Sequence, residues 1–289
     1  MPRDQHLSFR ALAAAPVAWV AAFLLGFTVM PGAFAPTFVR FEIEAAKAAA
    51  FVGCLAAARA FSPGDYLHRA WLLHASCYAL LLARDLVLIT VVRDQMAFGV
   101  PFAYVQALLV TGANVCLLVG SFMLARAWRV AGLELPGRPA WRAAATALWV
   151  AAAAAIIGQA LLIDARKLAE GHVGSVVGLS SDVSDLLSMC LVAPVFFTAL
   201  ALRGGVLRWP WALLTVGFLC WLFYDAGLVL THALALTDLP ARVFRESFRG
   251  AACLYVGAAG LAQALALREV APPPSSRPPV VSPGAALRQ

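Results

Sequence analysis

The chain has 289 residues, of which 62% are hydrophobic and only 13% are charged. Soluble domains average roughly 45–50% apolar and about 25% charged residues, so this composition, with a mean hydropathy of +0.83, excludes a soluble globular domain and indicates a polytopic membrane protein. The net charge of +7 does not indicate nucleic-acid binding, because membrane topology alone requires basic loops.

Eight apolar segments are long enough to cross a bilayer, and only helices satisfy their backbone groups in lipid over runs of this length. They cover residues 11–33, 40–61, 69–92, 100–128, 141–163, 182–202, 209–234 and 243–268. The connections are short except for residues 129–140 and 164–181, and the second of these is long enough for an amphipathic stretch or a lid. The sequence therefore predicts an all-α membrane protein with eight transmembrane helices.

The basic residues predict the orientation of these spans, since cytoplasmic loops carry an excess of Lys and Arg. A cytoplasmic N-terminus places these basic residues inside: Arg3, Arg10, Arg59, Arg69, Arg126, Arg129, Arg138, Arg142, Arg203, Arg208, Arg268, Arg277 and Arg288. The opposite face receives only Arg40, Arg93, Arg166, Lys167, Arg242 and Arg245. We predict an inner-membrane protein with both termini in the cytoplasm. The proline-rich segment 270–289 cannot pack a core, and we expect it to be a disordered cytoplasmic tail.

An internal repeat is indicated by two similar stretches, WLLHASCYALLLARD (71–85) and WALLTVGFLCWLFYD (211–225), each running from a Trp to an Asp. A small-residue pattern, Gly112, Cys116 and Gly120, also returns as Gly250, Cys253 and Gly257. A four-helix unit returns the chain to its starting side, so we predict two parallel repeats, residues 1–139 and 140–269. The alternative is that helices rich in Ala and Leu resemble one another through composition.

Polar side chains recur on one stripe of two predicted helices. His74 and Tyr78 lie about 20° either side of Asp85 on a helical wheel, and Asp225 shares a stripe with His232. Such stripes face the bundle interior, because an acid facing lipid costs several kcal/mol. Asn114 adds an amide on the fourth segment.

Embedded charges of both signs predict buried ion pairs, since unpaired ions are not tolerated in a low dielectric. We expect pairs between Asp85 and Lys47 and between Asp225 and Arg249, with Glu44 and Lys47 also meeting at positions i and i+3. The side chains of the neighbours Arg84 and Asp85 diverge by about 100° around the helix, so we do not expect a simple ion pair between them.

Ligand-binding or proton-relay candidates are therefore Asp85, Asp225, Arg84, Arg249, His74, Tyr78, His232 and Asn114. Secondary candidates are Glu44, Lys47, Asp182, Asp185 and Glu246. The structural alternative is that each embedded acid is tied to a buried partner and only fixes helix packing.

The absence of a recognisable catalytic constellation favours a receptor-like or binding membrane module with a charged small-molecule pocket in the outer half of the bundle. One alternative is a small proton-coupled transporter in which Asp85 and Asp225 are relay acids. Another is an intramembrane enzyme that acts on a lipid or isoprenoid, for which Asp182 and Asp185 are candidate groups.

No metal site and no cofactor is expected from the sequence. The six cysteines all lie in apolar segments without a CxxC pair, which is typical of small packing residues. The expected partners are the lipid bilayer, a small-molecule ligand, and a membrane or cytoplasmic protein.

Overall fold

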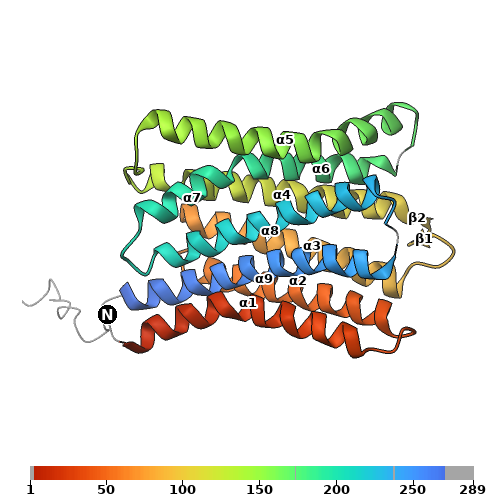
Figure 1. The fold of residues 1–289 in the computed structure, drawn as a ribbon, viewed down its shortest axis with the longest axis horizontal. Coiled ribbons are helices and arrows are strands. Elements are labelled where there is room, and N and C mark those ends of the chain that lie inside the picture. The colour runs from red at the N-terminus through yellow and green to blue at the C-terminus, as the bar shows by residue number, and fades with distance from the viewer. Residues whose placement is uncertain (1–2, 173, 237, 271–289) are drawn as a thin grey trace, which may run out of the picture.

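The computed structural model describes residues 3–172, 174–236 and 238–270. Within these residues the chain forms nine helices and one short hairpin, and the helices lie side by side along the long axis of the molecule (Figure 1). The helices are α1 (Arg3–Val29), α2 (Ala35–Arg59), α3 (Tyr66–Thr90), α4 (Phe102–Val130), α5 (Pro139–Ala169), α6 (Ser175–Cys190), α7 (Val192–Ala201), α8 (Arg208–Ala233) and α9 (Leu239–Val270). The hairpin strands are β1 (Met96–Ala97) and β2 (Val100–Pro101).

The predicted all-α membrane architecture is confirmed at the level of fold class. Seven helical segments of the described chain are long and apolar enough to cross a membrane, with α6 and α7 counted together as one segment. The exception is α2, whose first half carries Arg40, Glu42, Glu44 and Lys47. The predicted tail falls on residues 271–289, which lie outside the described residues.

The helices form a closed ring with two additional helices on its outside. Around the ring α2 packs on α3, α3 on α4, α4 on α6, α7 on α8, α8 on α9, and α9 again on α2. Helix α1 packs mainly on α9 and α5 mainly on α6, and these two helices form opposite edges of the molecule (Figure 1). Helix α9 is therefore central: 72% of its most apolar window is buried, against 11% for α1 and for α5.

Helices α2 and α9 approach one another through small residues. A Cβ atom added to Gly53 would overlap the backbone of Gly257, and one added to Gly260 would overlap the backbone of Gly53. Small residues permit such close backbone contact between membrane helices. The crossing fixes the position of α2 against α9, and with it the charged residues at the start of both helices.

The predicted span 182–202 is not one continuous helix. Helix α6 ends at Cys190, Leu191 separates it from α7, and the Leu191 amide donates a hydrogen bond to the Ser188 carbonyl at 3.0 Å. Pro194 has no N–H to donate to the Cys190 carbonyl four residues earlier, which accounts for the interruption.

The connection predicted over residues 164–181 is much shorter in the structure, because most of these residues extend the two flanking helices. Helix α5 continues to Ala169, and α6 begins at Ser175. The α5 terminus is fixed by Gly171, which has φ +89° and donates to the Leu168 carbonyl while His172 donates to the Lys167 carbonyl. This is a Schellman motif, and glycine adopts the positive φ without strain. The predicted connection over 129–140 is confirmed between α4 and α5.

Candidate functional site

The buried and ion-paired charged side chains of α2, α3 and α9 lie in one half of the bundle, toward the end that carries the β1–β2 hairpin. We call this the hairpin end; it also holds the α1–α2, α5–α6 and α8–α9 connections (Figure 1). Asp85 lies five residues before the end of α3, and Asp225 lies eight residues before the end of α8. At 1.5 Å per residue these aspartates lie roughly 8 and 12 Å from their helix ends.

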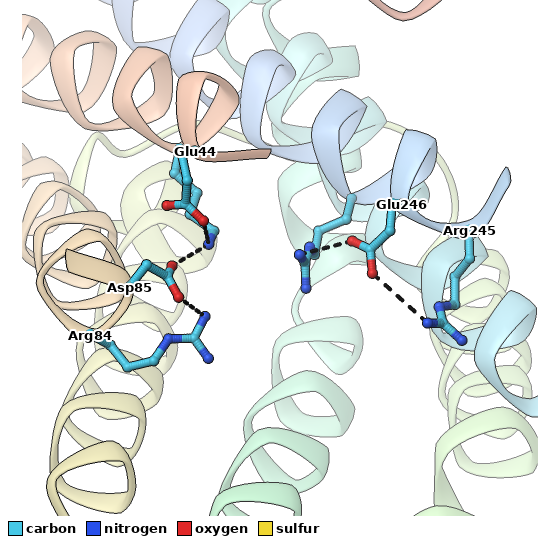
Figure 2. A network of polar contacts seen from close by, with 7 residues as sticks. Glu44, Arg84, Asp85, Arg245 and Glu246 are labelled. Atoms are coloured by element: carbon cyan, nitrogen blue, oxygen red, sulfur yellow. Dashed lines mark hydrogen bonds and ion pairs between the residues drawn. The ribbon is translucent and has the colours of Figure 1, made fainter. Parts of the chain in front are cut away.

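The first group joins α2 to α3 through four side chains, Glu44, Lys47, Arg84 and Asp85, which we call the ionic cluster (Figure 2). Lys47 Nζ lies 2.5 Å from Asp85 Oδ2 and 3.0 Å from Glu44 Oε1. Lys47 and Asp85 are only 3% and 5% exposed. Each carboxylate oxygen of Asp85 faces a different cation, so its charge is compensated on both sides.

The predicted pair between Asp85 and Lys47 therefore forms, as does the local pair between Glu44 and Lys47. The expectation that Arg84 would not pair with its neighbour was wrong, because Arg84 Nη2 lies 2.6 Å from Asp85 Oδ1. The two side chains do diverge at Cβ, but the long arginine stem turns back and returns the guanidinium to the carboxylate (Figure 2).

A second ionic group lies on α9 and consists of Arg245, Glu246 and Arg249. Arg249 Nη2 lies 2.8 Å from Glu246 Oε2, and Arg245 Nη2 lies 3.8 Å from Glu246 Oε1 (Figure 2). The guanidinium of Arg249 also lies over the Tyr224 ring, 5.6 Å from its centroid. The predicted pair with Asp225 does not form, because Arg249 turns toward Tyr224, and the next residue on α8 points about 100° away.

The third group contains only acids: Asp182 and Asp185 on α6 and Asp225 on α8, which we call the carboxylate cluster. Asp182 and Asp185 lie one turn apart on α6, and Asp182 lines the same cavity as Leu228 and Val229, which lie about one turn beyond Asp225 on α8. No ion pair involves any of these three residues within the described part of the chain. The Oδ2 atoms of Asp182 and Asp225 are shielded from solvent and have no hydrogen-bond partner there.

The remaining candidate residues fix helix packing. His74 is fully buried on α3; its Nδ1 lies 3.0 Å from the Ala70 carbonyl and its Nε2 lies 3.4 Å from Ser121 Oγ on α4. Tyr78 is 1% exposed, so the predicted stripe with Asp85 does face the interior. Asn114 Nδ2 donates to Ser180 Oγ at 3.3 Å and to Ser181 Oγ at 3.1 Å, which ties α4 to α6. The side chain of His232 lies outside the described residues.

A cavity of about 910 Å³ opens at the hairpin end between α5, α6, α8 and α9, and we call it the hairpin-end cavity. Its charged and polar lining consists of Gln159, Asp164, Lys167, Asp182, Thr231, Asp238, Arg242 and Arg245. Its apolar lining consists of Ala160, Ile163, Leu228, Val229, Ala235 and Leu236, with Gly178 beside them. Of the residues singled out from the sequence, Asp182 alone lines this cavity.

Two side chains of the cavity are held in place by their neighbours. Arg245 Nη1 donates to Thr231 Oγ1 at 3.4 Å, and Lys167 Nζ lies 3.9 Å from Asp164 Oδ1. The cavity thus presents cations and acids beside an apolar wall. Among the described residues no three His, Cys, Asp or Glu side chains are placed to hold a metal ion.

Three lining residues of this cavity, Asp164, Lys167 and Gly178, were missed because the sequence places them in the connection over residues 164–181. The sequence does indicate that the helix continues here, because the run from Asp164 to Glu170 is rich in helix-forming residues and is followed by Gly171. Read as a helix, this run brings Asp164 and Lys167 onto one face at positions i and i+3.

Comparison of the chain with protein-family models, with curated proteins and with solved structures finds no match. The function is accordingly argued from the geometry of this half of the bundle.

Proposed function

We propose that this protein is a multi-pass membrane binding module of the receptor-like kind, which takes a small charged molecule in the hairpin-end cavity. The observation that supports this most is the lining: basic side chains, acidic side chains and an apolar wall converge on one cavity of about 910 Å³. Small-molecule sites combine these features, with a few polar groups that orient the ligand and apolar groups that exclude water.

The lining favours a ligand that carries charge at one end and an apolar body at the other. Arg245 reaches the cavity with its guanidinium directed by Thr231, and Arg242 lies one turn away on α9. Leu228, Val229 and Ile163 supply apolar contact opposite these groups. An amphipathic acid or zwitterion satisfies both parts of this surface, and Asp182 and Asp238 add acceptors for an amine.

The membrane arrangement that we propose has eight crossings, which are the seven long apolar helical segments and α2. Helix α2 has 25 residues, which at 1.5 Å each is about 37 Å, and it packs within the ring against α9 and α3. Its charged residues are compatible with a span because Lys47 and Glu44 pair with one another there. The basic-residue bias supports an inner-membrane location with cytoplasmic termini, which places the hairpin end on the outer side.

The two-repeat organisation, residues 1–139 and 140–269, is part of the same proposal. It is supported by two matching helix contacts between the halves. Helix α2 of the first half packs on α9 of the second, and α6 of the second half packs on α4 of the first. In each case the second helix of one half lies against the fourth helix of the other. A pseudo-twofold axis along the membrane normal produces this arrangement.

Native mass spectrometry of gently solubilised protein tests the binding function. We expect a retained small molecule or lipid on the wild type, and at least about tenfold less of it on Arg245→Ala, which corresponds to about 1.4 kcal/mol of binding free energy. The matched control is Arg129→Ala, because Arg129 is exposed and lies at the end of α4 that is away from the hairpin. This variant should retain the wild-type amount of bound molecule. A wild type without bound mass, or equal occupancy in Arg245→Ala, would contradict the proposal.

A further inference from the structure

None of the acids of the carboxylate cluster forms an ion pair within the described residues, and the Oδ2 atoms of Asp182 and Asp225 are shielded from solvent. Asp185 is ten residues into α6, roughly 15 Å from the first residue of that helix. At such a depth an ionised acid without a partner is costly, and embedded acids in membrane proteins pair, face water or take up protons.

The groups that face the carboxylate cluster from each neighbouring helix do not supply a cation. Asp164 of α5 lies against Gly178, one turn before Asp182 on α6, and lines the hairpin-end cavity with Asp182. Asn114 of α4 donates to Ser180 and Ser181, and Tyr224 precedes Asp225 on α8. The nearby basic residues of α9 are engaged elsewhere, since Arg245 and Arg249 pair with Glu246. Lys167 of α5 lies 3.9 Å from Asp164 and forms no ion pair with the cluster within the described residues.

A separate observation concerns Ser188, which is 2% exposed and whose Oγ has no hydrogen-bond partner among the described residues. Ser188 follows Asp185 by three residues on α6, about 60° around the helix and about 4.5 Å along it. A hydroxyl buried without a hydrogen-bond partner destabilises the folded state. A hydroxyl can accept a hydrogen bond from a protonated carboxyl, which an ionised carboxylate cannot donate.

The helix interruption lies directly beyond this hydroxyl. Helix α6 ends at Cys190, and Pro194 leaves the Cys190 carbonyl without its helical donor. Interrupted helices beside embedded acids recur at the proton and ion sites of membrane transporters. The interruption, the unpartnered hydroxyl and two of the three acids thus all lie between Asp182 and Leu191.

We propose that Asp182, Asp185 and Asp225 form a proton-binding site, in which bound protons are shared between neighbouring carboxyl groups. A proton on Asp185 or Asp225 converts one acid from acceptor to donor, which replaces repulsion between two carboxylates by a hydrogen bond. A proton that reaches the site comes from water through the hairpin-end cavity, because Asp182 lines that cavity and lies within the cluster. The ionic cluster is not part of this site, since Lys47 and Arg84 hold both oxygens of Asp85.

A metal ion is a less suitable occupant than a proton. The described residues contain no group of three His, Cys, Asp or Glu side chains arranged to hold a metal. A proton requires only two neighbouring carboxyl groups, such as Asp182 and Asp185 one turn apart on α6, so it is the cation that suits this arrangement.

Infrared spectroscopy of the full chain in detergent or lipid, titrated with acid and base, tests this proposal. The band of un-ionised carboxyl groups should persist in the wild type at neutral pH, where surface carboxyls are ionised. Asp225→Asn and Asp185→Asn should each remove much of it. Asp65→Asn, at an exposed position, should leave it unchanged. Native gel filtration and helical circular dichroism of each variant establish that the comparison is made on folded protein.

Three outcomes would overturn the proposal: no un-ionised carboxyl band in the wild type at neutral pH, a band that all of the cluster variants retain, or a band that disappears when choline chloride is replaced by sodium chloride. The last result would assign the site to sodium. If Asp225→Asn does not fold, Asp225→Glu provides the second variant, and it should shift the band without removing it. These results do not depend on any ligand in the hairpin-end cavity, so loss of the binding function and loss of the proton site are distinguishable.

Discussion

The ionic cluster and the carboxylate cluster lie in the same half of the bundle, and each contains an aspartate that follows a tryptophan by fourteen residues, Asp85 and Asp225. In the first, Lys47 and Arg84 hold the two oxygens of Asp85 at 2.5 and 2.6 Å. In the second, three acids lie together with no ion-pair partner among the described residues. Two cations compensate Asp85, whereas Asp225 has no ion-pair partner among the described residues. In our proposal the first aspartate therefore stabilises a helix contact and the second binds a proton.

The largest effect that separates the clusters is expected from Lys47→Ala. This change leaves the buried Asp85 and the half-buried Glu44 with one cation fewer. We expect the free energy of unfolding to fall by about 3 kcal/mol or more, since breaking a buried ion pair typically costs about 3–5 kcal/mol. Unfolding in mixed micelles, followed by circular dichroism, measures it.

The matched control for Lys47→Ala is Lys167→Ala, which removes the other lysine of the chain. The Lys167 side chain is 54% exposed and lies 3.9 Å from Asp164, so its loss should cost less than about 1 kcal/mol. Equal losses for the two variants would show that the ionic cluster does not stabilise the α2–α3 contact.

A smaller effect is expected at the crossing that positions α2 against α9. In Gly53→Ala the new methyl group meets the Gly257 carbonyl, so the two backbones must separate, and we expect a loss of about 1–3 kcal/mol. Gly158→Ala on α5, where an added Cβ meets nothing within 4 Å, is the control and should be neutral or stabilising. Thermal unfolding of the three proteins in one detergent gives the comparison, and equal midpoints for the two variants would refute the close crossing.

Asn114→Ala should have the smallest effect. It removes the two hydrogen bonds to Ser180 and Ser181 that tie α4 to the helix that carries Asp182 and Asp185. Hydrogen bonds between membrane helices average about 0.6 kcal/mol, so we expect a loss of roughly that size in unfolding measurements. If Asn114→Ala lowered the free energy of unfolding as much as Lys47→Ala, this polar contact would stabilise the hairpin-end half of the bundle as strongly as the ionic cluster does.

Much of the fold follows from the sequence because hydrophobic runs of spanning length leave the backbone no other arrangement than helices in lipid. The interruption at Leu191 was not predicted, since the segment from Asp182 to Leu202 is continuously apolar beyond its first turn and Pro194 alone does not determine whether a helix bends or breaks. The continuation of α5 to Ala169 was missed because its charged last turns resemble a loop by composition.

The site could be predicted only in part. The pair between Lys47 and Asp85 follows from the need to compensate embedded charges of opposite sign. The partner of Arg249 depends on the rotation of α9 against α8, which places Tyr224 rather than Asp225 beneath it, and hydropathy contains no information about that rotation. The hairpin-end cavity depends on four helix ends that meet in space, so only the structure brings Asp164, Asp182 and Arg245 together.

The central claim is that Asp85 is a structural acid and that Asp225 is not, and one pair of matched substitutions tests it directly. Unfolding of Asp85→Asn and Asp225→Asn should be measured in the same micelles at neutral pH. We predict that Asp85→Asn loses about 3 kcal/mol, because two buried cations lose their shared carboxylate. Asp225→Asn should lose less than about 1 kcal/mol or gain stability, because no ion pair is broken. Equal losses, or a larger loss for Asp225→Asn, would contradict the distinction between the two clusters.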